Sequence, residues 1–330
     1  MSVTLKDIAE IAGVSIGTVS RVINNKTNEI SDATVKKIEK IIKEEGYVPN
    51  IRARSLKTNR SNILGLLIPN IKNPFFTEIV RGVEDTAYNL GYSVIMGNTY
   101  DDFLKETKYL NTFHELRVDG IIVAGAYDRD KETEEAYSFE VPLIAIDRAV
   151  YYKNISTFIT TDNYGSSKKI VEYFLKNNYQ SFFYLGGPKK NYVAKQRYEG
   201  TLKGLEGKKI KNFKEKFGSF SISDGYNLIK KEKNIQDYDV IICGNDLLAV
   251  GAIQALKEKG INIPSDISIF GFDNMALFSE IKPRLSTVKQ PSYQIGVDSV
   301  TLIDRILKGE KVDPIHKLSQ ELLFRDTTKN

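Results

Sequence analysis

The sequence predicts an α/β protein in which a small all-helical unit precedes two doubly wound parallel-sheet units. Apolar residues recur at helical spacing through the first 46 residues, whereas short apolar runs alternate with amphipathic helices from Ser61 onward. Such alternation is typical of a parallel sheet that helices cover on both faces. A chain of 330 residues with 41% hydrophobic residues is long enough for one small unit and a larger, divided core.

The segment 4–24, TLKDIAEIAGVSIGTVSRVIN, predicts two short helices joined by a tight turn. Thr4 can cap the first helix while Asp7 reaches back to it, which is the capping-box pattern. Gly13 suits the turn, and Ser15 can cap the second helix. The outer face of the second helix offers small, hydroxylated and basic side chains, a mix suited to base edges and phosphates. These side chains belong to Ile16, Gly17, Thr18, Ser20 and Arg21.

The charge distribution favours a nucleic-acid partner for this end of the chain. The first 60 residues hold 11 Lys and Arg against 7 Asp and Glu, whereas the remaining 270 hold 36 against 35. A chain can fold without such an uneven distribution of basic residues, whereas a segment that neutralises phosphates needs a basic excess. The competing interpretation is an ordinary surface helix pair, which would not account for the basic excess.

A third helix is expected from Ser31 to Glu45, with Ser31 as its cap and Gly46 as its left-handed stop. No acidic residue occurs between Gly46 and Thr77. This composition favours a linker that lies beside a polyanion. The alternative is a flexible basic tether in which Leu56 packs locally. The basic residues of the stretch are Arg52, Arg54, Lys57, Arg60 and Lys72.

Seven apolar runs after Ser61 predict the strands of the larger part. They span 62–68, 92–97, 120–125, 143–147, 182–187, 240–244 and 267–272. Helices are expected between them, including Phe76 to Leu90, Asp102 to Leu116, Tyr164 to Lys176, Asp246 to Lys259 and Tyr293 to Leu307. Repetition of this kind over some 270 residues suggests two doubly wound units of similar size, joined near Phe158 to Asp162.

Several motifs in order resemble the LacI/GalR family of bacterial transcriptional regulators. They are TLKDIAEIAGVSIGTVSRVIN, YVPNIRARSLKTNRSNILGLLIP, VDGIIVAG, CGNDLLAVGAI, DISIFGFDN and LSTVKQP. The resemblance implies a helix-turn-helix headpiece at 1–46, a hinge at 47–60 and an effector-binding and dimerisation domain of periplasmic-binding-protein type at 61–330. Within that domain it implies an N-subdomain of about 61–160 plus 291–318, and a C-subdomain of about 161–289 plus 319–330.

The resemblance also implies a hinge helix that pairs with its dimer mate in the minor groove of operator DNA. Leu56 matches the family's wedge leucine, and an apolar wedge flanked by Arg is a known way to kink a duplex. Arg52 stands where several relatives carry a small apolar residue. The residues expected to contact DNA are Thr4, Ser15, Ile16, Gly17, Thr18, Ser20, Arg21, Asn24, Arg54, Leu56 and Lys57.

Polar and aromatic residues follow the predicted strands, where ligands of open α/β sheets bind. They are Asn70, Phe75, Phe76, Asn98, Tyr100, Tyr127, Asp147, Arg148, Asn245, Asp246, Asp273 and Asn274. Carboxylates and amides can engage neighbouring hydroxyls, while a flat ring covers the apolar face of a sugar or a base. Asp147 and Asp246 could instead cap or brace loops, and Phe76 and Phe220 could be core residues.

By family position, the resemblance implies that Arg197 and Asp273 clamp the effector. It adds Phe75, Phe76, Asp147, Phe220, Asn245 and Gln290 as further effector-binding residues. Asn191 and Val193 stand where purine-binding relatives place Arg and Thr, which favours a sugar or sugar phosphate as the ligand.

Other functional classes are poorly supported. The glycine cluster LGGPKK matches no phosphate-binding loop, and Asp246 with Asp273 would need a defined separation for glycoside hydrolysis. With two His and one Cys we expect no catalytic residue, no metal site and no cofactor. A solute-binding protein of periplasmic type is the remaining alternative, but the start lacks the apolar stretch of a secretory signal, so we expect a cytoplasmic protein.

Taken together, the sequence predicts a homodimeric, sequence-specific DNA-binding repressor. We expect it to bind a near-palindromic operator. A small molecule, a sugar or sugar derivative, is expected to control operator affinity from a cleft between two lobes.

Overall fold

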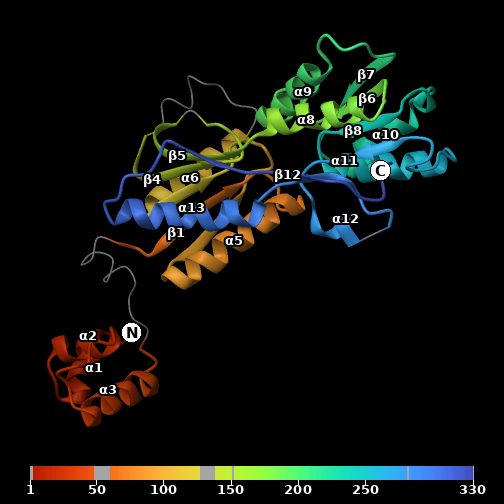
Figure 1. Cartoon of the computed structure of the whole chain (residues 1–330). Coiled ribbons are helices and arrows are strands. Elements are labelled where there is room, and N and C mark those ends of the chain that lie inside the picture. Colours follow the sequence, from red (N-terminus) through yellow and green to blue (C-terminus); the bar gives the residue numbers. More distant parts are fainter. Residues whose placement is uncertain (1–2, 48–59, 127–137, 151, 281, 330) are drawn as a thin grey trace. The chain divides into compact units, whose positions relative to one another are not determined.

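The computed structural model describes residues 3–47, 60–126, 138–150, 152–280 and 282–329. The chain forms two compact units, Met1–Ser61 and Asn62–Asn330, each with its own core (Figure 1). Within the described residues, no helix combines the length and the apolar character needed to cross a membrane.

The described part of the small unit contains three helices, α1 (Leu5–Ala12), α2 (Ile16–Ile23) and α3 (Asp32–Glu44). Thr4 and Asp7 form the predicted capping box, and Ser15 and Ser31 cap the next two helices. Gly13 adopts φ 68°, the left-handed conformation that a turn after α1 requires. The core is made of the apolar stripes of the three helices: Ile8, Ala9, Ala12, Val19, Val22, Ile38 and Ile41.

The first lobe of the large unit surrounds a parallel six-stranded sheet in the order β11-β5-β4-β3-β1-β2. Its strands are β1 (Ile63–Ile68), β2 (Ser93–Asn98), β3 (Gly120–Val123), β4 (Ser138–Ile146), β5 (Lys153–Thr161) and β11 (Ile315–Leu318). Helices α5 (Pro74–Leu90), α6 (Phe103–Glu115) and α13 (Ser292–Leu307) pack around it. We call this part the N-lobe, residues 62–161 and 291–318.

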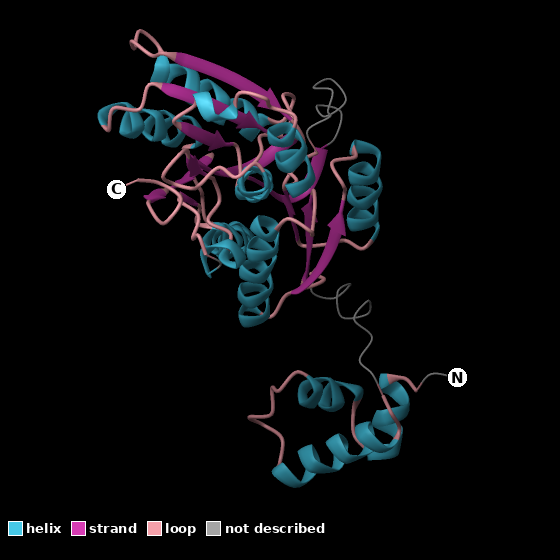
Figure 2. Ribbon diagram, turned by 90° about the vertical axis from the view of Figure 1, so that its right-hand side faces the viewer, coloured by secondary structure: helices cyan, strands magenta, loops and turns pink. Residues whose placement is uncertain are grey.

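The second lobe surrounds a parallel four-stranded sheet in the order β7-β6-β8-β9. Its strands are β6 (Ser181–Gly186), β7 (Asn212–Phe217), β8 (Val240–Cys243) and β9 (Ser268–Phe270). Its helices are α8 (Asn163–Lys176), α9 (Tyr192–Leu205), α10 (Ile222–Lys230), the short η1 (Ile235–Asp237), α11 (Asp246–Glu258) and α12 (Ala276–Glu280). We call this part the C-lobe, residues 162–290 and 319–329. Figure 2 shows helices flanking the strands of both lobes.

The chain passes between the lobes three times. The first crossing joins β5 to α8, the second joins β10 (Thr287–Lys289) to α13, and the third joins β11 to β12 (Glu321–Leu323). Strands β10 and β12 pair antiparallel, so the second and third crossings run side by side. Three connections of this kind define a hinged pair of lobes with a cleft between them.

Close helix contacts in each lobe depend on glycine. A Cβ atom at Gly82 in α5 would lie 2.2 Å from the carbonyl oxygen of Tyr293 in α13, and one at Gly296 would lie 2.3 Å from that of Ile79. No side chain fits at such a distance, so glycine lets the backbones of α5 and α13 approach directly.

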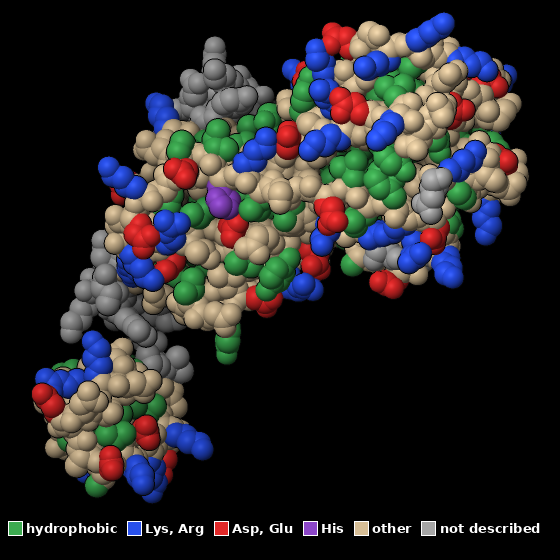
Figure 3. Space-filling model, in the orientation of Figure 1, with side chains coloured by type: hydrophobic (Ala, Val, Ile, Leu, Met, Phe, Trp, Pro, Cys, Tyr) green, Lys and Arg blue, Asp and Glu red, His purple; other side chains and the backbone are tan. Residues whose placement is uncertain are grey.

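On the face shown in Figure 3, charged side chains of both signs are interspersed over the large unit.

The structure confirms the predicted fold class and all seven strands, but it contains elements that the apolar runs did not indicate. Strands β5, with the sequence KNISTFITT, and β7, with NFKEKF, mix polar and apolar residues instead. β7 is an edge strand whose residues are all at least partly exposed, and it therefore carries a mixed sequence. The two sheets also differ in size, with six strands and four.

Candidate functional site

A cleft lies between the lobes, with residues of both lobes in its wall. The N-lobe contributes residues at the start of α5 and at the end of β4, while the C-lobe contributes residues from α9 and from the ends of its strands. The lining residues are Asn73, Phe75, Phe76, Asp147, Arg148, Asn191, Val193, Arg197, Phe220, Asn245 and Asp273. Ligands of open α/β sheets bind at this position, beyond the carboxyl ends of the strands.

Arg197, in α9, is the most constrained side chain of the cleft. Its guanidinium donates through Nη2 to Asp273 Oδ1 (3.1 Å), through Nε to Asn163 Oδ1 (2.9 Å) and through Nη1 to the carbonyl oxygen of Gly244 (2.6 Å). It also stacks 3.7 Å from the ring centroid of Phe272. Because these contacts hold the planar group in one orientation, Arg197 presents a preformed cationic edge.

Asp273, which follows β9, is buried at 6% exposure and adopts φ 116°. A non-glycine residue in this region is strained, and such strain often occurs at ligand sites. Its Oδ1 accepts hydrogen bonds from Arg197 and from Gln290 Nε2 (2.9 Å). Burial raises the pKa of Asp273 to about 6, although Arg197 opposes the shift. At neutral pH the group is therefore an ionised hydrogen-bond acceptor in the cleft wall.

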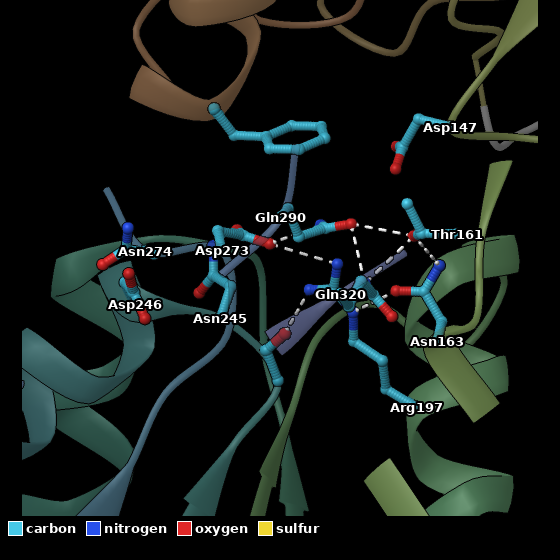
Figure 4. Close-up of polar contacts among 12 residues, drawn as sticks. Asp147, Thr161, Asn163, Arg197, Asn245, Asp246, Asp273, Asn274, Gln290 and Gln320 are labelled. Atoms are coloured by element: carbon cyan, nitrogen blue, oxygen red, sulfur yellow. Dashed lines mark hydrogen bonds and ion pairs between the residues drawn. The ribbon is translucent and has the colours of Figure 1, made fainter. Parts of the chain in front are cut away.

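Asp147 and Arg148 form the N-lobe side of the charged site. Both follow β4 and are buried, and Arg148 Nε lies 3.9 Å from Asp147 Oδ2. Burial raises the pKa of Asp147, while the neighbouring Arg148 opposes that shift. Arg148 also pairs with Asp101 and donates to the carbonyl oxygen of Gly125 (3.0 Å). Figure 4 shows the Asp147 carboxylate apart from the hydrogen-bonded residues of the C-lobe.

Two asparagines of the C-lobe present amide donors to the cleft. The Oδ1 atoms of Asn191 and Asn245 cap α9 and α11, accepting from the backbone N–H groups of Ala194 and Leu248 at 3.0 Å. Their Nδ2 atoms are buried and have no hydrogen-bond partner among the described residues. A buried donor without a partner is costly, so these amides indicate where a ligand or water accepts.

Aromatic rings form the apolar part of the wall. Phe75 and Phe76 sit in the first turn of α5 in a T-shaped arrangement, with ring centroids 5.1 Å apart. Both belong to the N-lobe core and also line the cleft, so core packing and ligand contact are compatible for them. Phe220 precedes α10 in the C-lobe and is half-buried. The rings can cover the apolar face of a bound ring compound.

The structure brings together seven of the eight residues that the sequence points to as effector contacts: Phe75, Phe76, Asp147, Arg197, Phe220, Asn245 and Asp273. Gln290 does not line the cleft, but its side-chain amide donates a hydrogen bond to Asp273. Sequence reasoning missed Asn73 as a lining residue, placed Arg148 at a strand end by the cleft without naming it an effector contact, and assigned no ligand role to Asn191. A signal was present, because Asn73 and Asn191 each precede a helix as its cap.

Other residues that follow the strands do not reach the cleft. Asp246 braces a loop and a crossing, Asn274 accepts from Arg325, and Asn98 accepts from the backbone of Ile71. Asn70 accepts from the backbone N–H of Lys72. Tyr100 is 57% exposed on the surface. Tyr127 lies outside the described residues. Short polar side chains at strand ends form hydrogen bonds with nearby donors. Sequence spacing does not show which donor lies within reach.

In the small unit, Ile16 is 48% exposed and Arg21 is exposed on the outer face of α2. The Nη1 atom of Arg21 lies 3.0 Å from Glu29 Oε2. Ser15 is held by Thr18, with 2.9 Å between the hydroxyl oxygens. Asn24 donates to the carbonyl oxygen of Ser20 (2.6 Å), and Thr4 is engaged in its capping box. Gly17 is exposed. The hinge residues Arg52, Arg54, Leu56 and Lys57 lie outside the described residues.

Known families and proteins match both parts of the chain. A family described as periplasmic binding proteins and sugar binding domain of the LacI family matches residues 61–315, and one described as bacterial regulatory proteins, lacI family, matches residues 4–50. The ribose operon repressor of Halalkalibacterium halodurans is 34% identical over 99% of this chain and 97% of that protein. The transcriptional repressor PurR of Mannheimia succiniciproducens is 32% identical over 99% of this chain and 98% of that protein.

Solved structures give the same result. The crystal structure of the lac repressor dimer bound to operator and the anti-inducer ONPF matches with a TM-score of 0.88 and 28% identity, over 99% of both chains. The relatives are regulators of transcription that match from end to end, which separates this chain from enzymes and from solute-binding proteins without a headpiece. The chain therefore belongs to the LacI family of bacterial regulatory proteins, as a DNA-binding transcriptional regulator under small-molecule control.

Proposed function

We propose that this regulator is a cytoplasmic, homodimeric repressor of a near-palindromic operator and that its effector is a neutral, single-ring sugar. The observation that carries the effector assignment is the pair of buried amide nitrogens of Asn191 and Asn245 in the cleft wall, which lack a partner among the described residues. Sugar hydroxyls can accept from both amides and donate to the carboxylates of Asp147 and Asp273. The aromatic rings can cover the remaining apolar face.

The charges of the cleft favour a neutral ligand over a phosphorylated one. Two guanidinium groups, of Arg148 and Arg197, are matched by two buried carboxylates, of Asp147 and Asp273. Both arginines are already engaged in ion pairs. A phosphate would meet the Asp147 carboxylate in a low-dielectric site and would be repelled by it. A sugar phosphate therefore fits this site less well than the free sugar.

The size of the cleft favours a small ligand. Its enclosed volume is about 20 Å³, far below the about 300–1,000 Å³ of small-molecule sites, so the lobes must separate to admit a ring, and one ring needs the least separation. The names of the relatives point to two ligand classes, since one is a ribose operon repressor and another is a purine-type repressor. Val193 carries no polar atom for a base, so we favour the sugar.

A thermal-shift screen tests this assignment. The panel contains D-ribose, other aldoses, D-ribose 5-phosphate, a disaccharide and hypoxanthine. A neutral monosaccharide at 100 times its Kd should raise the melting temperature by roughly 5 °C or more, because it binds only the folded state. Asp273→Ala should abolish the shift, and Asp273→Asn should reduce it while preserving the fold. The exposed Asp313→Ala variant is the matched control and should respond like the wild type.

Two results would contradict the sugar assignment. A shift with hypoxanthine alone would make the ligand a purine, and a shift with D-ribose 5-phosphate alone would refute the charge argument. If the ligand raised the melting temperature of both Asp273 variants as much as that of the wild type, the cleft would not be the binding site.

For DNA binding we propose that α2 of each protomer enters a major groove, with two half-sites related by the two-fold axis of the dimer. The solved relative is a dimer on operator, which supports this arrangement. Arg21 is our base reader, because a guanidinium can bind guanine O6 and N7 together, and Ile16 offers apolar contact to a thymine methyl. The hinge residues Arg54, Leu56 and Lys57 are proposed to act at the centre of the operator.

Replacing Arg21 by alanine should weaken operator binding by about 1–3 kcal/mol and relax preference at one base pair of each half-site. Among the described residues Arg21 pairs only with the exposed Glu29, and an exposed pair contributes little to stability. The variant should therefore fold normally. Fluorescence anisotropy with a duplex selected from a random library, and with its single base-pair variants, measures the change.

Lys57→Ala is the matched comparison. A lysine that contacts phosphate should lower affinity for all duplexes alike and reduce the salt dependence by about one phosphate contact. Equal losses on every duplex for both variants would show that Arg21 does not read a base.

A further inference from the structure

Three side chains, one from each crossing between the lobes, form a hydrogen-bonded cluster beside the cleft. Thr161 ends the first crossing strand, Gln290 follows β10 in the second, and Gln320 precedes β12 in the third. Thr161 Oγ1 donates to Gln290 Oε1 (2.9 Å), while Gln320 Nε2 donates to Thr161 Oγ1 (3.0 Å) and to Gln290 Oε1 (2.9 Å). We call these three residues the crossing node; Figure 4 shows its closed ring of contacts.

The hydrogen-bonding capacity of the crossing node is almost fully used. Thr161 Oγ1 also accepts from Asn163 Nδ2 (3.3 Å), and Gln320 Oε1 accepts from Ser166 Oγ (2.8 Å), both from α8. Rotating the Gln290 amide by half a turn would place two donors against each other, and rotating the Gln320 amide would place its Oε1 against Gln290 Oε1, two acceptors. The node therefore holds the three crossings in one mutual arrangement, and a change in any crossing must break bonds to the other two.

The crossing node is joined directly to the effector clamp. Gln290 Nε2 donates to the same Asp273 oxygen that accepts from Arg197. The backbone makes a second connection, because Asp273 N–H donates to the carbonyl oxygen of Val288 (2.9 Å) in β10. A third connection runs through Asn163, which accepts a hydrogen bond from Arg197 and donates one to Thr161 Oγ1. A ligand that displaces Asp273 therefore disturbs hydrogen bonds to all three crossings.

We propose that the crossing node transmits occupancy of the cleft to the relative position of the lobes, with Thr161 and Gln320 as positioning residues that act through Gln290 on Asp273. The inference rests on the proposed effector function and adds a regulatory route to the same site. A ligand shifts lobe arrangement only through contacts that differ between two states. The node supplies such a difference, because rotation of one lobe against the other twists the three crossings and breaks a saturated set of bonds.

The experiment uses the full-length, effector-free protein, so that it does not depend on the identity of the sugar. Amide hydrogen exchange is followed by mass spectrometry in four segments: 157–163, 270–274, 286–290 and 316–322. Thr161→Val and Gln320→Met remove node hydrogen bonds while keeping side-chain volume. Thr161→Ser restores the hydroxyl, and Gln294→Met alters an exposed glutamine that bonds only to Asp298 among the described residues.

Thr161→Val and Gln320→Met should each accelerate exchange about tenfold in all four segments, including the crossings and the cleft segment that the substitution does not touch. Thr161→Ser and Gln294→Met should exchange like the wild type. Strand β8, in the C-lobe core, should keep its wild-type protection in every variant, because the openings are local.

Three outcomes would overturn the proposal. The first is acceleration confined to the segment that carries the substitution, and the second is no acceleration in any segment. The third is an equal acceleration in β8, which would mean that the node only contributes to global stability. Since no sugar is added, failure here is distinct from failure of the thermal-shift screen.

Discussion

We expect Arg197→Met to lower the free energy of unfolding by about 3–5 kcal/mol at pH 8, the range found when one partner of a buried ion pair is removed. Arg197 and Asp273 are both almost fully buried, and their side chains are 3.1 Å apart. Methionine fills much of the space but leaves the Asp273 carboxylate without its cation. Asn163 and the Gly244 carbonyl also lose their donors. Urea unfolding followed by circular dichroism measures the change.

The pH dependence of this loss identifies its cause. Without Arg197 the pKa of Asp273 should rise above its wild-type value of about 6. The folded variant can then take up a proton as the pH falls, so the loss should be smaller at pH 5 than at pH 8. Combining Asp273→Asn with Arg197→Met should recover part of the lost free energy of unfolding at pH 8.

Lys195→Met, on the same helix but exposed, should change stability little. If Arg197→Met cost no more than Lys195→Met, or the same at both pH values, the buried ion pair would not be the source of the effect.

Asp246→Asn is expected to stabilise the protein at high pH. Asp246, in the first turn of α11, accepts from Met275 N–H (2.8 Å) and from Thr287 Oγ1 (2.7 Å). Burial, with Asp273 as a further cause, raises its pKa to about 8. The folded state therefore holds a proton on Asp246 at pH values where the unfolded chain has released it. Between about pH 4 and pH 8, this group makes stability fall as pH rises.

Asparagine removes that titration and keeps the contacts, since its oxygen can accept from Met275 while its amide donates to the Thr287 hydroxyl. The stability of Asp246→Asn relative to wild type should rise by on the order of 1 kcal/mol per pH unit up to about pH 8, and then level off. Denaturant titrations from pH 5 to pH 9 test this. Exposed Asp313→Asn should show no such slope. A difference that stays constant across this range would mean that Asp246 is ionised throughout.

Much of the fold follows from local sequence signals. Thr4, Ser15 and Ser31 cap the helices that their positions predict, because a cap acts within three or four residues. Buried parallel strands such as β1 and β8 are continuous apolar runs, which can be seen without knowing their neighbours. Strand β7 could not be found this way, because only its place at the sheet edge explains its mixed sequence.

The candidate site was predictable only in part. The strand ends located Asp147, Asn245 and Asp273, while Arg197 and Phe220 depended on family resemblance. Asn191 could be recognised locally only as the cap of α9, because its amide is left without a partner only once α9 packs into the C-lobe. Asp246 occupies a strand end like Asp273, but Met275 and Thr287 hold it away from the cleft.

The amino-acid order alone determined the helical headpiece, the apolar runs of the two sheets and the basic excess at the N-terminal end, because each depends on neighbours close in the chain. Tertiary structure decided which polar groups are buried together. Thr161 and Gln290 are 129 residues apart in the chain, yet they share a hydrogen bond next to the cleft. Such pairing has no sequence period, since the cost of burying a polar group is met by whichever partner the folded chain brings within reach.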